Sequence, residues 1–186
     1  MRKVTYEMSA SLDGYVVGPD GTFDWGAPTE EEFRFFLERL DDVGVHVMGR
    51  RLHETMLYWE TTDRDGMSEL EQTWADRWSP LPKLVLSTTL ESVHGAARLA
   101  TDDLATEIAR LRESPEPGDI AIGGATVAAE AARLGLIDEY RLRLCPVLVG
   151  GGLRYFAHDE RRADLELLET RRFDSGSVFL RYRVLR

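Results

Sequence analysis

Short apolar runs alternate with helical patterns along most of the chain. Three runs, VGVHVMG (residues 43–49), KLVLSTT (83–89) and IAIGG (120–124), each lead on to a helical pattern. Strands that alternate with helices favour right-handed crossovers and a largely parallel sheet. Residues 163–185 contain two alternating runs around a glycine-containing turn, which predicts a terminal β-hairpin at one sheet edge. The predicted class is therefore α/β, with a central mixed, mostly parallel sheet flanked by helices.

The N-terminal part predicts a strand, a loop and a helix in that order. Residues 3–10 alternate apolar with polar side chains, which is typical of a strand. Residues 11–28 are dense in Gly, Asp and Pro and predict a long loop. Thr29 and Glu32 then form a capping-box pattern before apolar residues at helical spacing, so we expect a helix to begin there.

Composition limits the classes of protein to which the chain can belong. Its 186 residues, 43% of them hydrophobic, suffice for one core, so we expect a single domain over residues 1–186. The net charge of -10 argues against nucleic acid and anionic membrane surfaces as partners. Cys145 is the only cysteine and the four histidines show no ligand spacing, so no disulfide or metal site is predicted. Without a membrane-spanning run or a signal-peptide core, a cytoplasmic protein is expected.

Three of the apolar runs end in residues suited to binding an anion. The pairs are Arg50–Arg51, Ser87–Thr88 (followed by a third hydroxyl residue, Thr89) and Gly123–Gly124. Guanidinium groups match phosphate geometry, hydroxyl groups can bond to phosphate or ribose, and glycines let a pyrophosphate approach the backbone. Each pair alone also fits a simpler alternative: surface arginines, an ordinary strand end, or a tight turn. Because parallel strands bring their carboxyl ends to one edge, the three together favour an anionic dinucleotide across that edge.

Other catalytic signals are few. The patterns G-x-G-x-x-G, G-x-x-x-x-G-K-[ST], H-E-x-x-H and G-x-S-x-G are all absent. Asp13, in the loop after the first strand, is the best single candidate for a polar group beside a substrate. Its alternative role is to hold the S-L-D-G turn by accepting hydrogen bonds from backbone N–H groups.

Several segments give the sequence a family resemblance. They are SLDGY (11–15), VMGRR (47–51), LVLSTT (84–89), residues 122–156 and the closing hairpin. Together they resemble the dihydrofolate reductase-like superfamily, and within it the C-terminal reductase domain of the bifunctional riboflavin-biosynthesis deaminase-reductase. The resemblance covers nearly the whole chain. It implies a single dihydrofolate reductase-like domain, an NADPH site and frequently a homodimer.

The resemblance also implies which residues contact NADPH. Residues 48–51 would meet the cofactor phosphates, and Ser87 and Thr88 would lie by the adenosine 2′-phosphate. Residues 123–126 would hold the pyrophosphate, and the first loop would close on the nicotinamide. The expected cofactor-binding set is Val17, Gly49, Arg50, Arg51, Ser87, Thr88, Ile122, Gly123, Gly124, Ala125 and Thr126.

Three departures from the family pattern concern a lost hydroxyl contact at Leu52, the substrate and the deaminase half. Leu52 stands where the family usually has threonine, and the first loop lacks the small and basic residues common in riboflavin reductases. The deaminase motifs H-x-E and P-C-x-x-C are missing. Residues 30–32 are glutamates near the place where dihydrofolate reductases carry a catalytic carboxylate.

The function predicted from these residues and this resemblance is NADPH-dependent reduction of a small heterocyclic substrate. Hydride would pass from the nicotinamide to a C=N or C=O bond, and the protein would orient the cofactor and exclude water. The first candidate substrate is a 5-amino-6-(5-phosphoribosylamino)uracil-type pyrimidine of riboflavin biosynthesis. The alternatives are a pteridine or dihydrofolate-type reductase, and a non-catalytic NADP(H)-binding module.

The closing strand adds a physical argument for a homodimer. Alternation would place Phe179 and Leu185 on the opposite face from Leu180 and Tyr182. A strand with one buried face does not need Phe179 among its outward residues, so a partner subunit is expected to cover that face. The alternative is that a helix of the same chain covers it.

Overall fold

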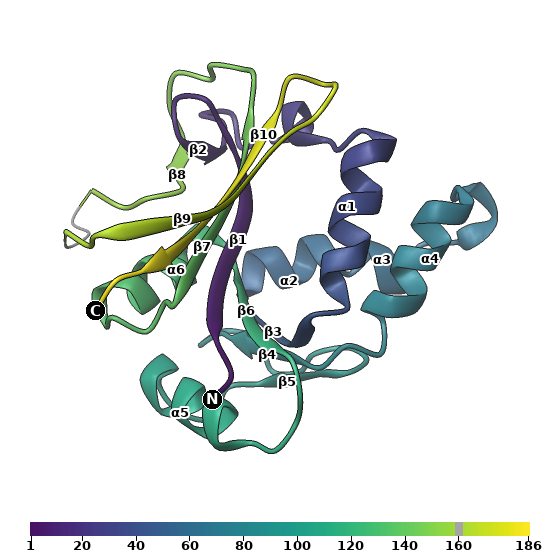
Figure 1. Cartoon of the computed structure of the whole chain (residues 1–186). Coiled ribbons are helices and arrows are strands. Elements are labelled where there is room, and N and C mark those ends of the chain that lie inside the picture. Colours follow the sequence, from purple (N-terminus) through teal and green to yellow (C-terminus); the bar gives the residue numbers. More distant parts are fainter. Residues whose placement is uncertain (159–161) are drawn as a thin grey trace.

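An eight-stranded sheet forms the centre of the computed structural model, which describes residues 1–158 and 162–186 (Figure 1). The strand order is β5-β4-β3-β6-β1-β7-β10-β9. The strands are β1 (Val4–Ser11), β3 (Val43–Gly49), β4 (Lys83–Leu86), β5 (Ala97–Leu99), β6 (Asp119–Gly123), β7 (Glu139–Cys145), β9 (Leu165–Arg172) and β10 (Val178–Val184). A separate two-stranded sheet pairs β2 (Tyr15–Val17) with β8 (Leu153–Arg154).

Strand directions confirm the predicted mixed sheet. The strands from β5 to β7 in this order all run parallel to their neighbours. β10 is antiparallel to β7, and β9 is antiparallel to β10. The terminal hairpin therefore forms one edge of the sheet, as its two alternating runs predict.

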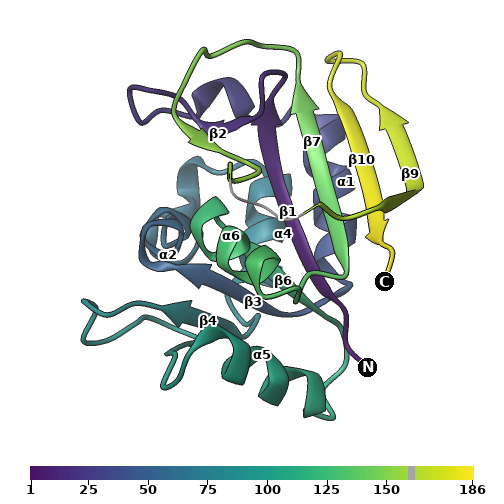
Figure 2. The ribbon, with the colours of Figure 1, turned by 90° about the vertical axis from the view of Figure 1, so that its left-hand side faces the viewer.

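Helices cover both faces of the sheet. They are α1 (Glu30–Leu40), α2 (Arg50–Met56), α3 (Tyr58–Thr61), α4 (Glu69–Trp78), α5 (Leu104–Glu113) and α6 (Ala125–Arg133), with 3-10 turns η1 (Asp24–Gly26) and η2 (Arg64–Gly66). α5 and α6 lie on one face, and α1 and α4 lie on the other (Figure 2). α1 begins at the predicted capping box: Glu32 N–H donates to Thr29 Oγ1, and Thr29 N–H donates to Glu32 Oε2. No described helix combines the length and apolar surface needed to cross a membrane.

Each face has its own apolar cluster. Under α5 and α6, buried Val4, Val47 and Ile122 of the sheet pack with Ile108 and Ala128 of the helices. On the other face, a second cluster centres on Met48, Val85 and Trp78. Burial of this kind contributes about 25 cal/mol per Å² of apolar surface and holds the strands in register.

Three short strands were not predicted from the sequence. They are β2, β5 and β8, each of two or three residues. Such segments are too short to display the alternation by which strands are recognised. β2 and β8 instead pair segments far apart in the chain, with Val17 opposite Leu153.

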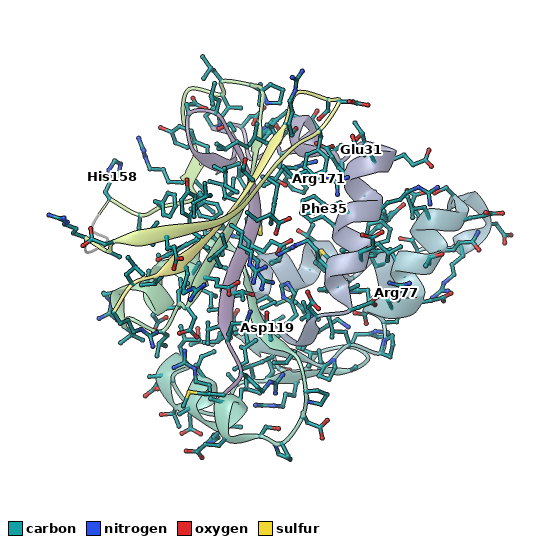
Figure 3. The ribbon with its side chains drawn as sticks, in the orientation of Figure 1. Glu31, Phe35, Arg77, Asp119, His158 and Arg171 are labelled. Atoms are coloured by element: carbon teal, nitrogen blue, oxygen red, sulfur yellow. The ribbon has the colours of Figure 1, made fainter. Side chains whose placement is uncertain are left out.

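The expected outward position of Phe179 is wrong. Phe179 is fully buried, with its ring centroid 4.8 Å from that of Phe35 and 6.3 Å from that of Phe36, both on α1. Figure 3 shows Phe35 beside Arg171 of the hairpin, whose guanidinium carbon lies 4.9 Å from the Phe35 ring centroid. A helix of the same chain therefore covers this face, while Leu185 lies exposed beyond the end of β10.

Candidate functional site

The three anion-suited pairs come together at one edge of the sheet. β4, β3 and β6 are neighbouring parallel strands, and their ends are in register: Gly49 lies opposite Leu86, and Met48 opposite Gly123. The loops that carry the pairs therefore leave the sheet at the same level. One contact joins two of them directly, because Arg50 Nη1 donates to Thr89 Oγ1 at 3.3 Å.

Gly124 forms an open N-terminus for α6. It is the N-cap residue, with φ 89° and ψ 125°, a conformation that residues with a side chain rarely adopt. No side chain caps the helix, so the first-turn N–H groups that begin at Ala125 and Thr126 receive no side-chain acceptor there. Such groups are suited to phosphate oxygens.

Gly123 has a different, steric reason to be glycine. A Cβ atom there would lie 2.4 Å from His46 Cε1 and 2.5 Å from Leu52 Cδ2. Leu52, which replaces the family threonine, thus packs against the glycine turn. Of the two glycines, only Gly124 has room for a Cβ atom, which would make an ordinary van der Waals contact with Leu52 at 3.8 Å.

The basic and hydroxyl residues at this edge differ in how many ion pairs and hydrogen bonds they make within the protein. Arg50 is 3.7 Å from Glu54 in an exposed ion pair, whereas exposed Arg51 has no ion pair among the described residues. Ser87 Oγ accepts the N–H groups of Thr89 and Leu90 at 3.2 and 3.0 Å. Ser87 Oγ also shares a hydrogen bond with Thr89 Oγ1 at 3.4 Å, so Ser87 shapes its own turn, which fits the simpler explanation of that pair.

The first loop occupies the end of the neighbouring strand β1. Asp13 accepts hydrogen bonds from Ser11 Oγ at 2.6 Å, Gly150 N at 2.8 Å and Val149 N at 3.2 Å. The Ser11 bond is the main cause that lowers the Asp13 pKa, and the two backbone N–H groups add to it. Asp13 is therefore ionised at neutral pH and holds the segment after β7 against the first loop, while Val17 is half-buried in β2.

A buried ion pair near this edge was not found from the sequence. The side chains of Arg143 on β7 and Glu32 on α1 are 2% and 1% exposed, and Arg143 Nη1 lies 2.9 Å from Glu32 Oε2. Arg143 also donates to Ser9 Oγ and to the Gly26 carbonyl. Ser175 Oγ donates to the other Glu32 oxygen at 2.9 Å. The pair ties α1, the first loop and the β9–β10 turn together.

Glu32 is consequently an ionised group with all of its partners inside the protein. Burial works to raise its pKa, but the Thr29 N–H and the Arg143 charge more than offset this, and the net pKa is lowered. Glu30 and Glu31 lie at the surface, within 2.6 Å of Arg34 and 3.3 Å of Arg171 respectively. No described group of three or more His, Cys, Asp or Glu residues could hold a metal ion.

This arrangement defines a class of protein. A largely parallel α/β sheet with a C-terminal antiparallel hairpin, and loops of glycine, arginine and hydroxyl residues at its carboxyl edge, is the dihydrofolate reductase-like architecture. Within that class, the family described as the RibD C-terminal domain matches residues 2–179, and the chain belongs to this family. Membership points to an oxidoreductase of the reductase type.

Similar proteins share the whole length of the chain. The uncharacterized protein YyaP of Bacillus subtilis (strain 168) is 29% identical over 182 residues, covering 97% of this chain and 94% of YyaP. A putative riboflavin biosynthesis protein from Shewanella sp. PV-4 has a TM-score of 0.78 at 23% identity, with both chains fully covered. A pyrimidine reductase-like protein from Corynebacterium diphtheriae has a TM-score of 0.64 at 14% identity, over 100% of this chain and 92% of that chain.

A bifunctional relative is longer than this chain. The diaminohydroxyphosphoribosylaminopyrimidine deaminase/5-amino-6-(5-phosphoribosylamino)uracil reductase of Thermotoga maritima has a TM-score of 0.65 at 14% identity. The match covers 99% of this chain but 57% of that protein. At these identities the solved structures establish the fold.

Proposed function

We propose that the chain is an NADPH-dependent reductase that transfers hydride to a C=N or C=O bond of a small heterocyclic substrate. The observation that carries the proposal is the convergence of three anion-suited loops at the carboxyl edge of β3, β4 and β6. The residues present fit a dinucleotide, because Arg51 lacks an ion pair among the described residues and the α6 N-terminus lacks a side-chain cap.

Under this proposal, different residues contact different parts of the cofactor. The N–H groups of Ala125 and Thr126, next to Gly124, bind the pyrophosphate, and Arg50 and Arg51 neutralise the charge of the adenosine 2′-phosphate. Ser87 and Thr88 bond to the adenosine 2′-phosphate, and Gly49 and Ile122 line the approach. When bound, NADPH supplies the hydride, and the first loop with Val17 excludes water from the nicotinamide.

Two carboxylates near the first loop have orienting roles. Asp13 and Glu32 both have lowered pKa values, so each is ionised at neutral pH and neither is a proton donor there. Asp13 keeps the first loop in place beside the substrate. The proton that accompanies hydride transfer therefore comes from a donor other than these two carboxylates. A pyrimidine of the 5-amino-6-(5-phosphoribosylamino)uracil type is the first substrate to test, with dihydrofolate as the alternative.

Cofactor titrations test this proposal. Binding of NADPH and NADH is followed by nicotinamide fluorescence, and turnover by the loss of reduced nicotinamide with the pyrimidine or with dihydrofolate. We expect tighter binding of NADPH than of NADH, and turnover of one substrate. Binding without turnover of any heterocycle would support a non-catalytic NADP(H)-binding module. Absence of NADPH binding would contradict both.

We also propose a homodimer, formed through the face of the hairpin opposite α1. Leu180 of β10 lies opposite Leu142 of β7, and Tyr182 of β10 lies opposite Leu167 of β9. Because cross-strand partners share a face, these four side chains lie on the same face of the sheet. Leu167 is 51% exposed there. An apolar sheet face of this kind suits a second copy of the chain.

Light scattering tests the dimer. Leu167→Asp is expected to shift the mass to the monomer value of 21.1 kDa, because it places a charge in the interface. Tyr58→Asp is the matched control, since Tyr58 is 47% exposed on α3, which packs with α4 on the α1 side of the sheet. A wild-type mass near 21.1 kDa would contradict the dimer.

A further inference from the structure

The loop over residues 87–96 connects β4 to β5 and begins with two of the residues assigned to the adenosine 2′-phosphate. Ser87 and Thr88 follow directly after β4. Further along, Leu90 and Val93 are partly buried and pack against the apolar cluster around Met48. The middle of the loop therefore rests on the body of the protein, and its conformation depends on what holds it there.

One helical segment contacts this loop near both of its ends. α2 and α3 together lie within residues 50–61. Near the start of the loop, Arg50 at the beginning of α2 donates to Thr89 Oγ1. Near its end, His94 Nδ1 lies 3.2 Å from Glu60 Oε2 on α3. A carboxylate oxygen accepts hydrogen bonds, so His94 is the donor in this contact.

Glu60 is fixed from the inside of the protein. Its side chain is 4% exposed, and Glu60 Oε1 lies 2.9 Å from Nζ of Lys83, whose side chain is 1% exposed. Lys83 Nζ also donates to the carbonyl groups of Trp78 and Leu81 at 2.8 and 3.1 Å. One carboxylate oxygen is thus bound to a buried cation at the end of α4, and the other faces the loop.

The residue after His94 is also fitted to Glu60. Gly95 has a φ of 63°, and a Cβ atom there would lie 2.5 Å from Glu60 Oε2. Glu60 could make room for such an atom only by leaving Lys83, which would separate a buried ion pair. Glycine lets the loop backbone approach the carboxylate closely, so two consecutive loop residues match the position of Glu60.

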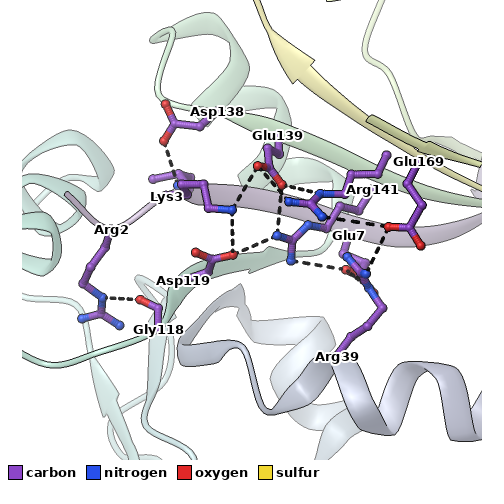
Figure 4. A network of polar contacts seen from close by, with 12 residues as sticks. Arg2, Lys3, Glu7, Arg39, Gly118, Asp119, Asp138, Glu139, Arg141 and Glu169 are labelled. Atoms are coloured by element: carbon purple, nitrogen blue, oxygen red, sulfur yellow. Dashed lines mark hydrogen bonds and ion pairs between the residues drawn. The ribbon is translucent and has the colours of Figure 1, made fainter. Parts of the chain in front are cut away.

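A comparison with another buried carboxylate shows what is particular about Glu60. Figure 4 shows Lys3 and Arg141 converging on Glu139, and the side chain of Glu139 is 5% exposed. The partners of Glu139 lie on strands of the sheet or directly before β1, so Glu139 joins strands that are already paired. His94, in contrast, is 59% exposed on a loop. Glu60 therefore joins a buried lysine to a segment that backbone pairing does not hold.

We propose that Glu60 and His94 are positioning residues that hold residues 87–89 in place for the 2′-phosphate and so set a preference for NADPH over NADH. The inference rests on the proposed reductase function. A bound phosphate competes with Thr89 for the Arg50 guanidinium. The Glu60–His94 contact is unaffected by that exchange, so the loop stays in place when Arg50 turns to the phosphate.

Variants of His94 test the effect on the cofactor, because an exposed side chain can be changed without disturbing the core. His94→Ala should weaken NADPH about 3- to 10-fold, the factor that corresponds to one net hydrogen bond. NADH lacks the 2′-phosphate, so its affinity should change less than about twofold. His94→Asn carries a side-chain amide that can donate in place of Nδ1, and it should retain the wild-type preference.

The matched control is a second exposed histidine. His158 lies on the segment after β8, which Figure 3 places on the other side of the molecule from α4. His158→Ala removes the same kind of side chain and should leave both cofactor affinities unchanged.

Amide hydrogen exchange followed by NMR, without any cofactor, tests whether the pair holds the loop. The N–H groups of Thr89 and Leu90 are bonded to Ser87 Oγ, so their exchange rates report on the turn at residues 87–90. His94→Ala should speed exchange at both amides at least about threefold, whereas His94→Asn should not. The amide of Ile108 in α5 is the internal reference and should not change.

Three results would overturn the proposal: unchanged exchange at Thr89 and Leu90 in His94→Ala, equal weakening of NADPH and NADH, or equal behaviour of the Ala and Asn variants. A wild-type protein that binds neither cofactor would contradict the reductase proposal, and the assigned role in NADPH preference would fail with it. The exchange rates would still decide, on their own, whether Glu60 and His94 hold the loop.

Discussion

The carboxyl edge of β3, β4 and β6 and the sheet face beneath α1 use polar groups in opposite ways. At the edge, backbone N–H groups, Gly124 and Arg51 are without side-chain partners among the described residues. Beneath α1, Arg143 and Glu32 are buried and bonded to each other and to three separate segments. Groups that the protein satisfies internally stabilise the fold, and groups that it leaves open are available for a ligand. Substitutions in the two regions should therefore change different quantities.

The largest expected effect is on stability, at the buried pair. Arg143→Ala leaves the Glu32 carboxylate buried without its counter-charge, which is expected to cost about 3–5 kcal/mol in the free energy of unfolding. Urea unfolding measures this loss. The double variant Arg143→Met/Glu32→Gln removes both charges and should recover part of it. A loss below about 1 kcal/mol for Arg143→Ala would show that the pair does not stabilise the fold as inferred.

At the carboxyl edge the expected effect is on affinity. Arg50→Ala or Arg51→Ala should weaken NADPH by roughly 10- to 150-fold, because a charge-assisted hydrogen bond is worth ~1.5–3 kcal/mol. NADH, which lacks the 2′-phosphate, should be spared. The free energy of unfolding should stay within about 0.5 kcal/mol of wild type. If the substitutions weakened the binding of NADPH and NADH equally, the role assigned to Arg50 and Arg51 at the 2′-phosphate would be wrong.

The loss of stability at low pH tests the same distinction at Glu139, a carboxylate whose partners lie inside the protein. The pKa of Glu139 is lowered from 4.5 to about 2, so its ionised form is favoured by folding. Its contribution is present above pH 4.5 and is lost as the pH falls toward 2. Glu139→Gln should be less stable at neutral pH and should lose less on acidification. Unfolding by urea at several pH values tests this, and parallel curves for both proteins would contradict it.

The smallest effect is expected at an exposed pair on α1. Arg34 and Glu30 are four residues apart, with Arg34 Nη2 2.6 Å from Glu30 Oε1, and both side chains are mostly exposed. Arg34→Ala should cost about 0.2–0.5 kcal/mol, and less in high salt. Urea unfolding at two salt concentrations measures this. A loss near that of Arg143→Ala would break the distinction between internally satisfied and exposed charges.

Local sequence patterns predicted the helices and most strands of the fold. Which strand faces are buried depends on long-range contacts, which those patterns do not contain. The capping box at Thr29 and the alternating runs of the hairpin each depend on nearby residues, and both are confirmed. Arg141 and Arg143 alternate with apolar residues on β7, a pattern equally typical of a solvent-facing strand. Only the arrival of α1, more than 100 residues earlier in the chain, makes that face buried. The same helix covers Phe179, which is why the prediction that a partner subunit covers this side chain was wrong.

For the candidate site, the sequence predicted where the residues come together but not the role of each residue. Parallel strands had to bring the three residue pairs to one edge, and they do. The separate reasons for Gly123 and Gly124 could not be read from the sequence, because they depend on His46, Leu52 and a backbone angle. Asp13 likewise takes its backbone partners from Val149 and Gly150, which lie 136 and 137 residues later in the chain.

The hairpin edge of the sheet has a consequence for how the protein behaves when crowded. β9 is the outermost strand of the described sheet, and a free strand edge is a template for pairing with other chains. The register between β9 and β10 shifts, and Leu168 is the extra residue of the resulting β-bulge. This extra residue breaks the regular spacing of the hydrogen-bonding groups of β9, and Glu166, Glu169, Arg171 and Arg172 add charge along it. Deleting Leu168 would straighten β9 and restore a regular edge. The shortened protein should then be more prone to strand-to-strand aggregation than the native chain.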